Sequence, residues 1–446
     1  MALFAVAGAA LAQENLARLY SHPVVPPDEV LDRLHLKLAW RTFIPTDGRR
    51  DGLLTVHVLN DQIVVQTRSG LMVALNPKDG SAQWRAAIGF PYRAYNAIAH
   101  NDRSVIAYNG VNLFGLDRKT GQFQWALIPE NAPSAGPVAD DERIYLCQAT
   151  GRLDVYELPD GKEKKLPPPP GPAPAAGTPP ATESPTLPVV ESPLAPADVT
   201  GLPRTVKQPQ FIFGFRPGGR LERTPLLAEN TLLLADTTGL LQGVYKLGPN
   251  VQYSVDLESP VTAPMAQFGS IAYIATLDQH VTALDIGRGR IDWQFLAAAP
   301  VRIQPAVTEE DVYITAEAAG LHRINRRTGD EIWRNSGAGQ FLAANKSLVY
   351  ARDIQGARLL IIDRQRGTTL TQYKVRDFVF PIANTTTDRL FLAANDGSLA
   401  CFHDRAYAAP MSWQPAPEAP AQPTKPAKKP VEPKAPPSSE DKPTEK

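Results

Sequence analysis

A unit of about forty residues recurs along the chain and constrains its fold more than any other feature. Each clear copy holds a ten-residue stretch that begins with an apolar residue, turns at a glycine and ends in tryptophan. The four stretches are Leu75–Trp84, Leu116–Trp125, Leu284–Trp293 and Ile324–Trp333. Repeats of this length are typical of architectures in which each unit buries its apolar face against the next unit.

A short apolar strand precedes each turn, and eight such strands are found, from Gln62–Gln66 to Arg389–Ala393. Dipeptides such as Asn109-Gly110 follow them, which favour tight hairpins. Only seven outer strands follow the eight pairs, and Leu36–Phe43 at the other end of the chain supplies an eighth. The sequence therefore predicts an all-β fold, an eight-bladed β-propeller of four-stranded blades. Its last blade is closed by pairing of the N-terminal and C-terminal strands, which removes the open edge.

Two proline-rich segments interrupt this pattern. Residues 166–210 contain 14 prolines and residues 410–446 contain 11. Neither has enough apolar side chains to offset the entropy lost on ordering, so we expect both to be disordered. Counting forty residues from Trp125 leads to Lys165, which places residues 166–210 as an insertion between two repeats. The propeller is expected over residues 36–405, with the disordered tail over 406–446.

The N-terminus is apolar and ends in the small residues Ala10-Leu11-Ala12, as in the core of a secretory signal. We interpret residues 1–12 as a signal peptide, with a buried N-terminal helix as the alternative. Residues 13–35 have helical spacing and predict a short arm packed on the main body. The protein is then expected to be exported, to the periplasm or cell envelope.

The pattern Leu-Asp-x-x-Thr-Gly-x-x-x-Trp resembles the PQQ-like (quinoprotein-type) β-propeller repeat over roughly residues 36–165 and 211–405. Within that family, the blade number and the apolar leader are most similar to the BamB group of outer-membrane assembly scaffolds. The resemblance implies a non-catalytic exported scaffold that binds a partner protein through loops on one face. The chain departs from that group in lacking a lipobox cysteine and in carrying the two proline-rich segments.

Residue patterns that carry chemistry are missing. The seven histidines have no metal-ligand spacing, and neither a phosphate loop nor a Gly-x-Ser-x-Gly elbow occurs. We therefore expect no catalytic, cofactor-binding or metal-binding residues. The alternatives are a PQQ-dependent dehydrogenase, or an envelope sensor or surface-display module. Cys147 and Cys401 fall three blades apart, too far for a disulfide.

The net charge and the hydropathy of the chain limit the kinds of partner that we expect it to bind. Lys and Arg together number 46, as do Asp and Glu, so the net charge is zero and no basic stripe for nucleic acid is expected. No apolar run reaches the roughly 18 residues of an integral membrane segment. We expect a monomer that binds a protein partner in the cell envelope.

The partner should be bound by loops rich in aromatic residues and arginine. The loop Phe90–Tyr95 between two blades is the best candidate, through Tyr92, Arg93 and Tyr95. Asp278, His280 and Arg302 lie at corresponding turns of a later blade. Packing between blades is the alternative role for each of these residues.

Overall fold

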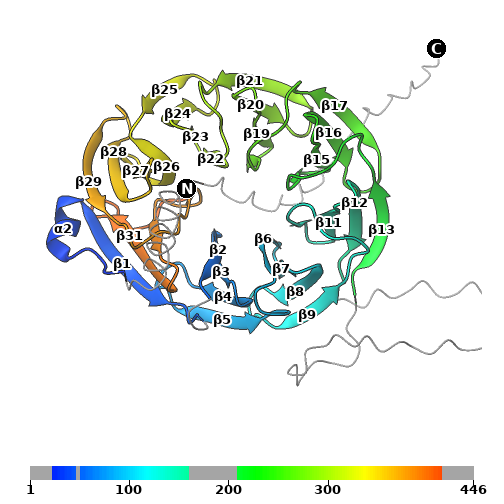
Figure 1. Cartoon of the computed structure of the whole chain (residues 1–446), viewed down its shortest axis with the longest axis horizontal. Coiled ribbons are helices and arrows are strands. Elements are labelled where there is room, and N and C mark those ends of the chain that lie inside the picture. Colours follow the sequence, from blue (N-terminus) through cyan, green and yellow to red (C-terminus); the bar gives the residue numbers. More distant parts are fainter. Residues whose placement is uncertain (1–22, 47–50, 160–207, 414–446) are drawn as a thin grey trace, which may run out of the picture. The chain divides into compact units, whose positions relative to one another are not determined.

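The computed structural model describes residues 23–46, 51–159 and 208–413 and, apart from one short helix, consists of strands (Figure 1). The strands form eight antiparallel sheets, which Figure 1 shows arranged around a central axis. We number them as blades one to eight along the chain. The predicted eight-bladed propeller is confirmed.

The first four blades run from the innermost to the outermost strand as follows. Blade one is β2 Leu53–Val58, β3 Ile63–Thr67, β4 Leu71–Leu75 and β5 Ala82–Ala87; blade two is β6 Ala94–His100, β7 Ser104–Asn109, β8 Asn112–Asp117 and β9 Phe123–Leu127. Blade three is β10 Val138–Ala139, β11 Arg143–Cys147, β12 Leu153–Glu157 and β13 Gln210–Phe215; blade four is β14 Leu226–Ala228, β15 Thr231–Ala235, β16 Leu240–Tyr245 and β17 Val251–Asp256.

The other blades follow the same order. Blade five is β18 Ala266–Phe268, β19 Ile271–Ala275, β20 His280–Asp285 and β21 Arg290–Leu296; blade six is β22 Ala306–Val307, β23 Asp311–Ala316, β24 Gly320–Asn325 and β25 Glu331–Asn335. Blade seven is β26 Ala338–Ala344, β27 Leu348–Asp353, β28 Arg358–Asp363 and β29 Thr369–Lys374; blade eight is β30 Leu390–Ala393, β31 Ser398–Asp404 and β1 Leu36–Phe43.

The ring closes as the sequence predicts. The N-terminal strand β1 pairs antiparallel with β31, from Leu36 opposite Asp404 to Phe43 opposite Ser398. Blade eight has three strands, and its innermost position is held by a single bridge between Phe380 and Ala393. The outer strand of the last blade therefore comes from the opposite end of the chain.

The core lies between neighbouring blades. The middle strands β3 and β7 are buried at every residue, because each sheet is covered on both sides by another sheet. Outer strands such as β21 expose most residues and bury the tryptophan. Trp293 of blade five thus belongs to one apolar cluster with Val312 and Ile314 of blade six.

The repeated tryptophan and glycine join one blade to the next. The indole Nε1 of Trp293 donates a hydrogen bond of 2.9 Å to the carbonyl of Arg326 in the next blade. The ring lies against Gly329 of the same turn, whose φ is +79° and whose missing Cβ would stand 2.7 Å from the ring. Trp40, Trp84 and Trp333 make the same pair of contacts with the blade that follows each.

The structure corrects the position of the insertion. Strand β13 completes blade three, so the insertion lies inside that blade, between β12 and β13, and Lys165 does not hold the aromatic position. Phe213 pairs with Val155 beside a bulge, as Trp84 pairs with Ala74, and stands forty residues before Tyr253. A surface hairpin turn accepts extra residues because the ladders on both sides keep their register.

A smaller correction concerns blade seven. Residue Thr371 occupies the position beside the bulge, opposite Ile361, and Tyr373 lies two residues further along β29. The forty-residue spacing from Trp333 to Tyr373 therefore does not reflect structural equivalence.

The helical arm is present in part as α2, Asp28–Arg33, with Asp28 and Glu29 in its first turn. It packs Leu31 and Leu34 into the cluster between blades seven and eight. At the other end, the described chain continues to Trp413, which is buried and donates from Nε1 to the Ala344 carbonyl at 3.0 Å. The proposed signal peptide 1–12 lies outside the described residues, as do nearly all of the insertion (166–207) and the tail after Trp413.

Candidate protein-binding face

The strand order gives the ring two different faces. Within each antiparallel blade, the turn between the second and third strands opens on the same face as the link to the next blade. The turns between the first and second and between the third and fourth strands open on the opposite face. We call the first the apolar face and the second the charged face, for the side chains that each one carries.

The apolar face is defined by large apolar side chains that are exposed in its loops. Leu277 in the β19–β20 turn is 54% exposed, and Ile354 after β27 is 52% exposed. Outside the strands, α2 and the segment before it, the charged face has one comparable side chain among the described residues, Leu247. The seven on the apolar face are Phe90, Tyr92, Val111, Ile128, Leu277, Ile303 and Ile354.

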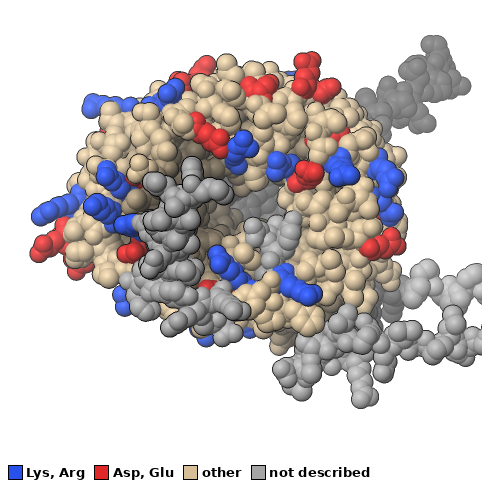
Figure 2. Space-filling model, in the orientation of Figure 1, with Lys and Arg blue, Asp and Glu red and all other residues tan. Residues whose placement is uncertain are grey.

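Basic side chains accompany them. Arg68, Arg93 and Arg302 lie in loops of this face and are exposed. In Figure 2, which draws one face of the ring, Lys and Arg side chains lie around the central hollow together with Asp and Glu side chains. Apolar and arginine side chains exposed together are the composition of a protein interface.

The predicted loop between β5 and β6 is held by one buried side chain. Asn109 accepts from the backbone N–H of Phe90 at 2.9 Å and donates from Nδ2 to the carbonyls of Ile88 and Phe90 at 3.0 and 2.9 Å. Tyr92, at φ +62°, donates its N–H to the Arg68 carbonyl at 2.8 Å. The loop backbone is therefore fixed by hydrogen bonds to Asn109 of β7 and to Arg68 of the β3–β4 turn.

The side chains of this loop remain outside the core. Tyr92 is 51% exposed, and the guanidinium carbon of Arg93 lies 5.7 Å from the centre of the Phe90 ring. Tyr95 falls near the start of β6, and its side chain lies outside the described residues. The structure thus brings Tyr92 and Arg93 together with Phe90, which the prediction treated only as the start of the loop.

The second group of predicted residues lies in blades five and six. Nδ1 of His280 is 2.8 Å from Oδ2 of Asp278, and the Thr276 hydroxyl donates to Oδ1 of Asp278 at 2.5 Å. Burial raises the pKa of Asp278, but the hydrogen bonds from Thr276 and His280 outweigh it and hold that pKa below its usual value. Nε of Arg302 lies 2.9 Å from Oε1 of Glu317, which belongs to a turn of blade six.

Both groups share the apolar face but not one site. Tyr92 and Arg93 lie between blades one and two, whereas Asp278, His280 and Arg302 lie four blades further around the ring. Sequence reasoning missed the exposed apolar residues of the turns, Val111, Leu277 and Ile354. A large apolar residue next to glycine or aspartate in a hairpin turn was the signal that could have found them.

The described residues offer few candidates for thiol or metal chemistry. The thiols of Cys147 and Cys401 are free and buried, and burial raises the pKa of each to about 12. Within the described ranges, no three His, Cys, Asp or Glu side chains gather as metal ligands do. No helix in those ranges is long and apolar enough to span a membrane.

Comparisons with known proteins bear on the fold and on the family of the chain separately. Among curated protein sequences none matches the chain. Solved structures share its fold at low sequence identity. BamB from Moraxella catarrhalis superposes with a TM-score of 0.59 at 12% identity, over 84% of this chain and 99% of that one. The computationally designed Ika8 protein gives 0.55 at 14% identity, over 82% and 99%, and Saccharomyces cerevisiae Sqt1 gives 0.54 at 8% identity, over 82% and 98%.

The family is shown by a sequence model rather than by these superpositions. The model described as outer membrane protein assembly factor BamB matches residues 30–168 and 242–428, which is most of the chain. The interruption between the two matches contains most of the insertion, together with β13, β14 and β15. The chain therefore belongs to the BamB family of PQQ-like β-propellers.

Proposed function

We propose that the protein is a non-catalytic, exported scaffold that binds a partner protein through the apolar face, in assembly of outer-membrane proteins. The observation that carries the proposal is the unequal distribution of exposed apolar loop residues between the two faces. Family membership supports the assembly role, because the matching model is described as an outer-membrane assembly factor.

Two properties of the β5–β6 loop favour binding: its side chains are exposed and its backbone is fixed. Tyrosine and arginine are the residue types that most often dominate binding energy, and Tyr92 and Arg93 are both exposed. Because Asn109 already fixes the loop backbone, little conformational entropy is lost when a partner docks. Asp278, His280 and Arg302 supply polar contacts on the opposite side of the same face.

Location and assembly state follow from the same proposal. We place the protein in the periplasm or cell envelope, as a monomer whose partner is a protein of the envelope. The dehydrogenase and the sensor or display module remain the alternatives from the sequence, and no specific contact among the described residues favours either.

The test compares matched double variants on the two faces. Tyr92→Ala with Arg93→Ala removes an exposed apolar and an exposed basic side chain from the apolar face. Leu247→Ala with Arg327→Ala removes the same two kinds of side chain from the charged face. Neither pair contributes to the core, so circular dichroism and thermal melting should match the parent protein.

A photo-crosslinking residue at position 277 in the native cell identifies the partner and supplies it for affinity measurement. The apolar-face variant should bind that partner at least tenfold more weakly, as loss of a tyrosine and an arginine anchor implies. The charged-face variant should bind as the parent does. Equal affinity of both variants would show that the partner is not held by this face.

A further inference from the structure

One histidine is buried between two blades and bonded on one side only. His322 lies in β24 of blade six with 2% of its side chain exposed. Its Nδ1 is 2.6 Å from Oε1 of Glu331 in β25 of the same blade. Its Nε2 is buried and has no hydrogen-bond partner within the described ranges. Neither nitrogen takes part in the contacts of the proposed function.

The pairing with Glu331 determines where a second proton must go. An ionised carboxylate can only accept, so the proton of the neutral ring is on Nδ1 and Nε2 holds the lone pair. Protonation of His322 therefore creates a new N–H group at Nε2, the buried nitrogen. A buried donor without an acceptor is unfavourable, and more so on a charged ring, so the protonated ring is stable only where water can reach it.

A neighbouring blade covers this ring. His322 packs edge-on against Phe295 of blade five, with 5.6 Å between the ring centres and 66° between the ring planes. Strand β24 begins and β21 ends on the apolar face, and His322 and Phe295 lie near those ends. Access of water to Nε2 therefore requires Phe295 to move away, which loosens the junction of the two blades beside the apolar face.

The charged groups that act on His322 come from one strand. They are Glu331 and Arg334 of β25, of which Arg334 lies directly opposite His322. On the other side, β23 places the apolar Ile314 opposite it. The two charged residues of β21 lie at the far end of that strand and pair with each other at 2.9 Å (Arg290 and Asp292). Burial lowers the pKa of His322, and the carboxylate of Glu331 offsets this lowering only in part.

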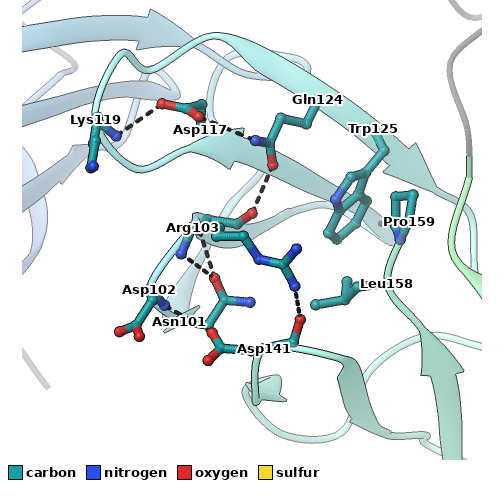
Figure 3. Close-up of a pocket in the computed structure, with 11 residues that line it drawn as sticks. Asn101, Asp102, Arg103, Asp117, Lys119, Gln124, Trp125, Asp141, Leu158 and Pro159 are labelled. Carbon is teal, nitrogen blue, oxygen red and sulfur yellow. Dashed lines mark hydrogen bonds between the residues drawn. The ribbon is translucent and has the colours of Figure 1, made fainter. Parts of the chain in front are cut away.

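The one-sided bonding of His322 differs from that of a polar side chain between two other blades. Asn101, between blades two and three, uses both ends of its amide (Figure 3). Its Oδ1 accepts from the Arg103 N–H at 2.9 Å, and its Nδ2 donates to the Asp140 carbonyl at 2.8 Å. An amide does not titrate, so these bonds are kept at every pH, whereas the packing of His322 is favourable only while the ring is neutral.

The fold does not require a histidine at this position. The equivalent residue is Thr282 in blade five, opposite Gln294, and Leu360 in blade seven, opposite Gln372. Leu360 is 4% exposed, so a side chain that carries no proton can fill the same space. The titratable group is thus an addition to the repeat.

We propose that His322 is a pH-sensitive switch, which loosens the junction of blades five and six beside the apolar face when the ring takes up a proton. Glu331 makes the protonated ring attainable by supplying a counter-charge at Nδ1. The unpartnered Nε2 prevents the closed junction from holding it.

The direction of the effect follows from linkage. The closed junction binds the proton more weakly than the open one, in which the pKa of histidine is about 6.5. The stability of the junction is therefore complete above that value and falls as the pH decreases below it.

Hydrogen exchange of the full chain, read by mass spectrometry at about pH 7.5 and about pH 5 and corrected for the intrinsic pH dependence of exchange, tests this switch. Strands β21, β24 and β25 should exchange at least about tenfold faster at the lower pH, while β4 and β5 of blade one keep their rates. His322→Leu, which copies blade seven, should remove the acceleration. His322→Gln keeps a polar side chain that does not titrate and should behave in the same way.

Three results would overturn the proposal. They are an unchanged exchange rate of β21, β24 and β25 in the parent protein, an acceleration of the same size in both His322 variants, and an equal acceleration in blade one. Glu331→Gln removes the counter-charge at Nδ1 and should move the acceleration to lower pH. A transition at the same pH in that variant would contradict the role given to Glu331.

Discussion

The two faces of the ring use their side chains for different purposes. On the charged face, charged groups of one blade pair with those of the next, as in Lys246 with Asp140 at 3.5 Å and Arg364 with Asp311 at 2.6 Å. On the apolar face, side chains such as Leu277 and Ile354 contribute little to the fold and are exposed. Stability and binding are thus separated in one repeat, because its turns alternate between the faces.

The largest loss of stability on the charged face is expected from a substitution of Asp311. This carboxylate is buried and meets Arg364 at 2.6 Å and Arg323 at 2.9 Å. Asp311→Asn should lower the free energy of unfolding by about 3–5 kcal/mol, because the buried carboxylate that pairs with both guanidinium groups is lost and only the exposed Glu310 still pairs with Arg364. Urea denaturation measures the change. Glu309→Gln, on an exposed residue of the same turn, is the control, and a loss of similar size there would contradict the assignment.

The glycine turns give the next largest effect. Gly329→Ala should lower the free energy of unfolding by roughly 2–4 kcal/mol, since φ is +79° and the new Cβ would meet the Trp293 ring. Gly356→Ala on the apolar face has a similar φ of +70° with open space around it, so only the backbone strain of about 1 kcal/mol applies. Thermal unfolding of both variants distinguishes the effect of the Trp293 ring contact from that of backbone strain. Equal losses of stability in the two variants would contradict a packing role for the ring.

A second buried carboxylate of the charged face should behave differently from Asp311. Burial raises the pKa of Asp388, whose Oδ1 is 3.8 Å from Arg389 and whose Oδ2 accepts no hydrogen bond from the described residues. The folded state therefore holds its proton more tightly than the unfolded state, in which the pKa is about 3.9. Its contribution to stability is present below that value and is lost as pH rises through the folded pKa.

The corresponding measurement is the pH dependence of unfolding for Asp388→Asn. The variant should gain on the parent between about pH 4 and neutrality, by about 1 kcal/mol, because it carries no charge to bury. Arg389 and His403 are the nearby charged groups that lower the pKa of Asp388, and both are unchanged in the variant. A gap between variant and parent that does not change with pH would refute this account.

The smallest stability effect is expected on the apolar face. Leu277→Ser and Ile354→Ser should each change the free energy of unfolding by less than about 0.5 kcal/mol, because both side chains are more than half exposed. Chemical denaturation at fixed pH measures this. A loss above 1 kcal/mol would mean that these residues serve the fold, and the separation of the two faces would fail.

Much of the ring could be predicted because the same local signals recur eight times. Strand β31 and its partner β1 were found by counting incomplete blades, and the register confirmed them. The position of the insertion could not be obtained by counting, since a period of forty fits extra residues before or after an outer strand equally well. Pairing decided it, through the contact of Phe213 with Val155.

The candidate site was predicted less fully than the fold. Tyr92 and Arg93 were found because aromatic and basic residues share one loop, and Asp278 with His280 because they share a turn. The sequence placed these groups at corresponding turns of two blades, but it could not show which side chains of those turns stay exposed, as Tyr92 does.

Closure of blade eight has a consequence for the order of folding. Leu36 meets Asp404 across nearly the whole length of the propeller, so this contact cannot form until the last strand has been synthesised. Joining ends so far apart carries a loop-closure entropy that local hairpins do not, which makes it a late and slow step. Until then β1 has no partner strand, and an unpaired strand edge invites association with other chains. The synthesis of β31 thus determines when the edge of β1 is no longer open to other chains.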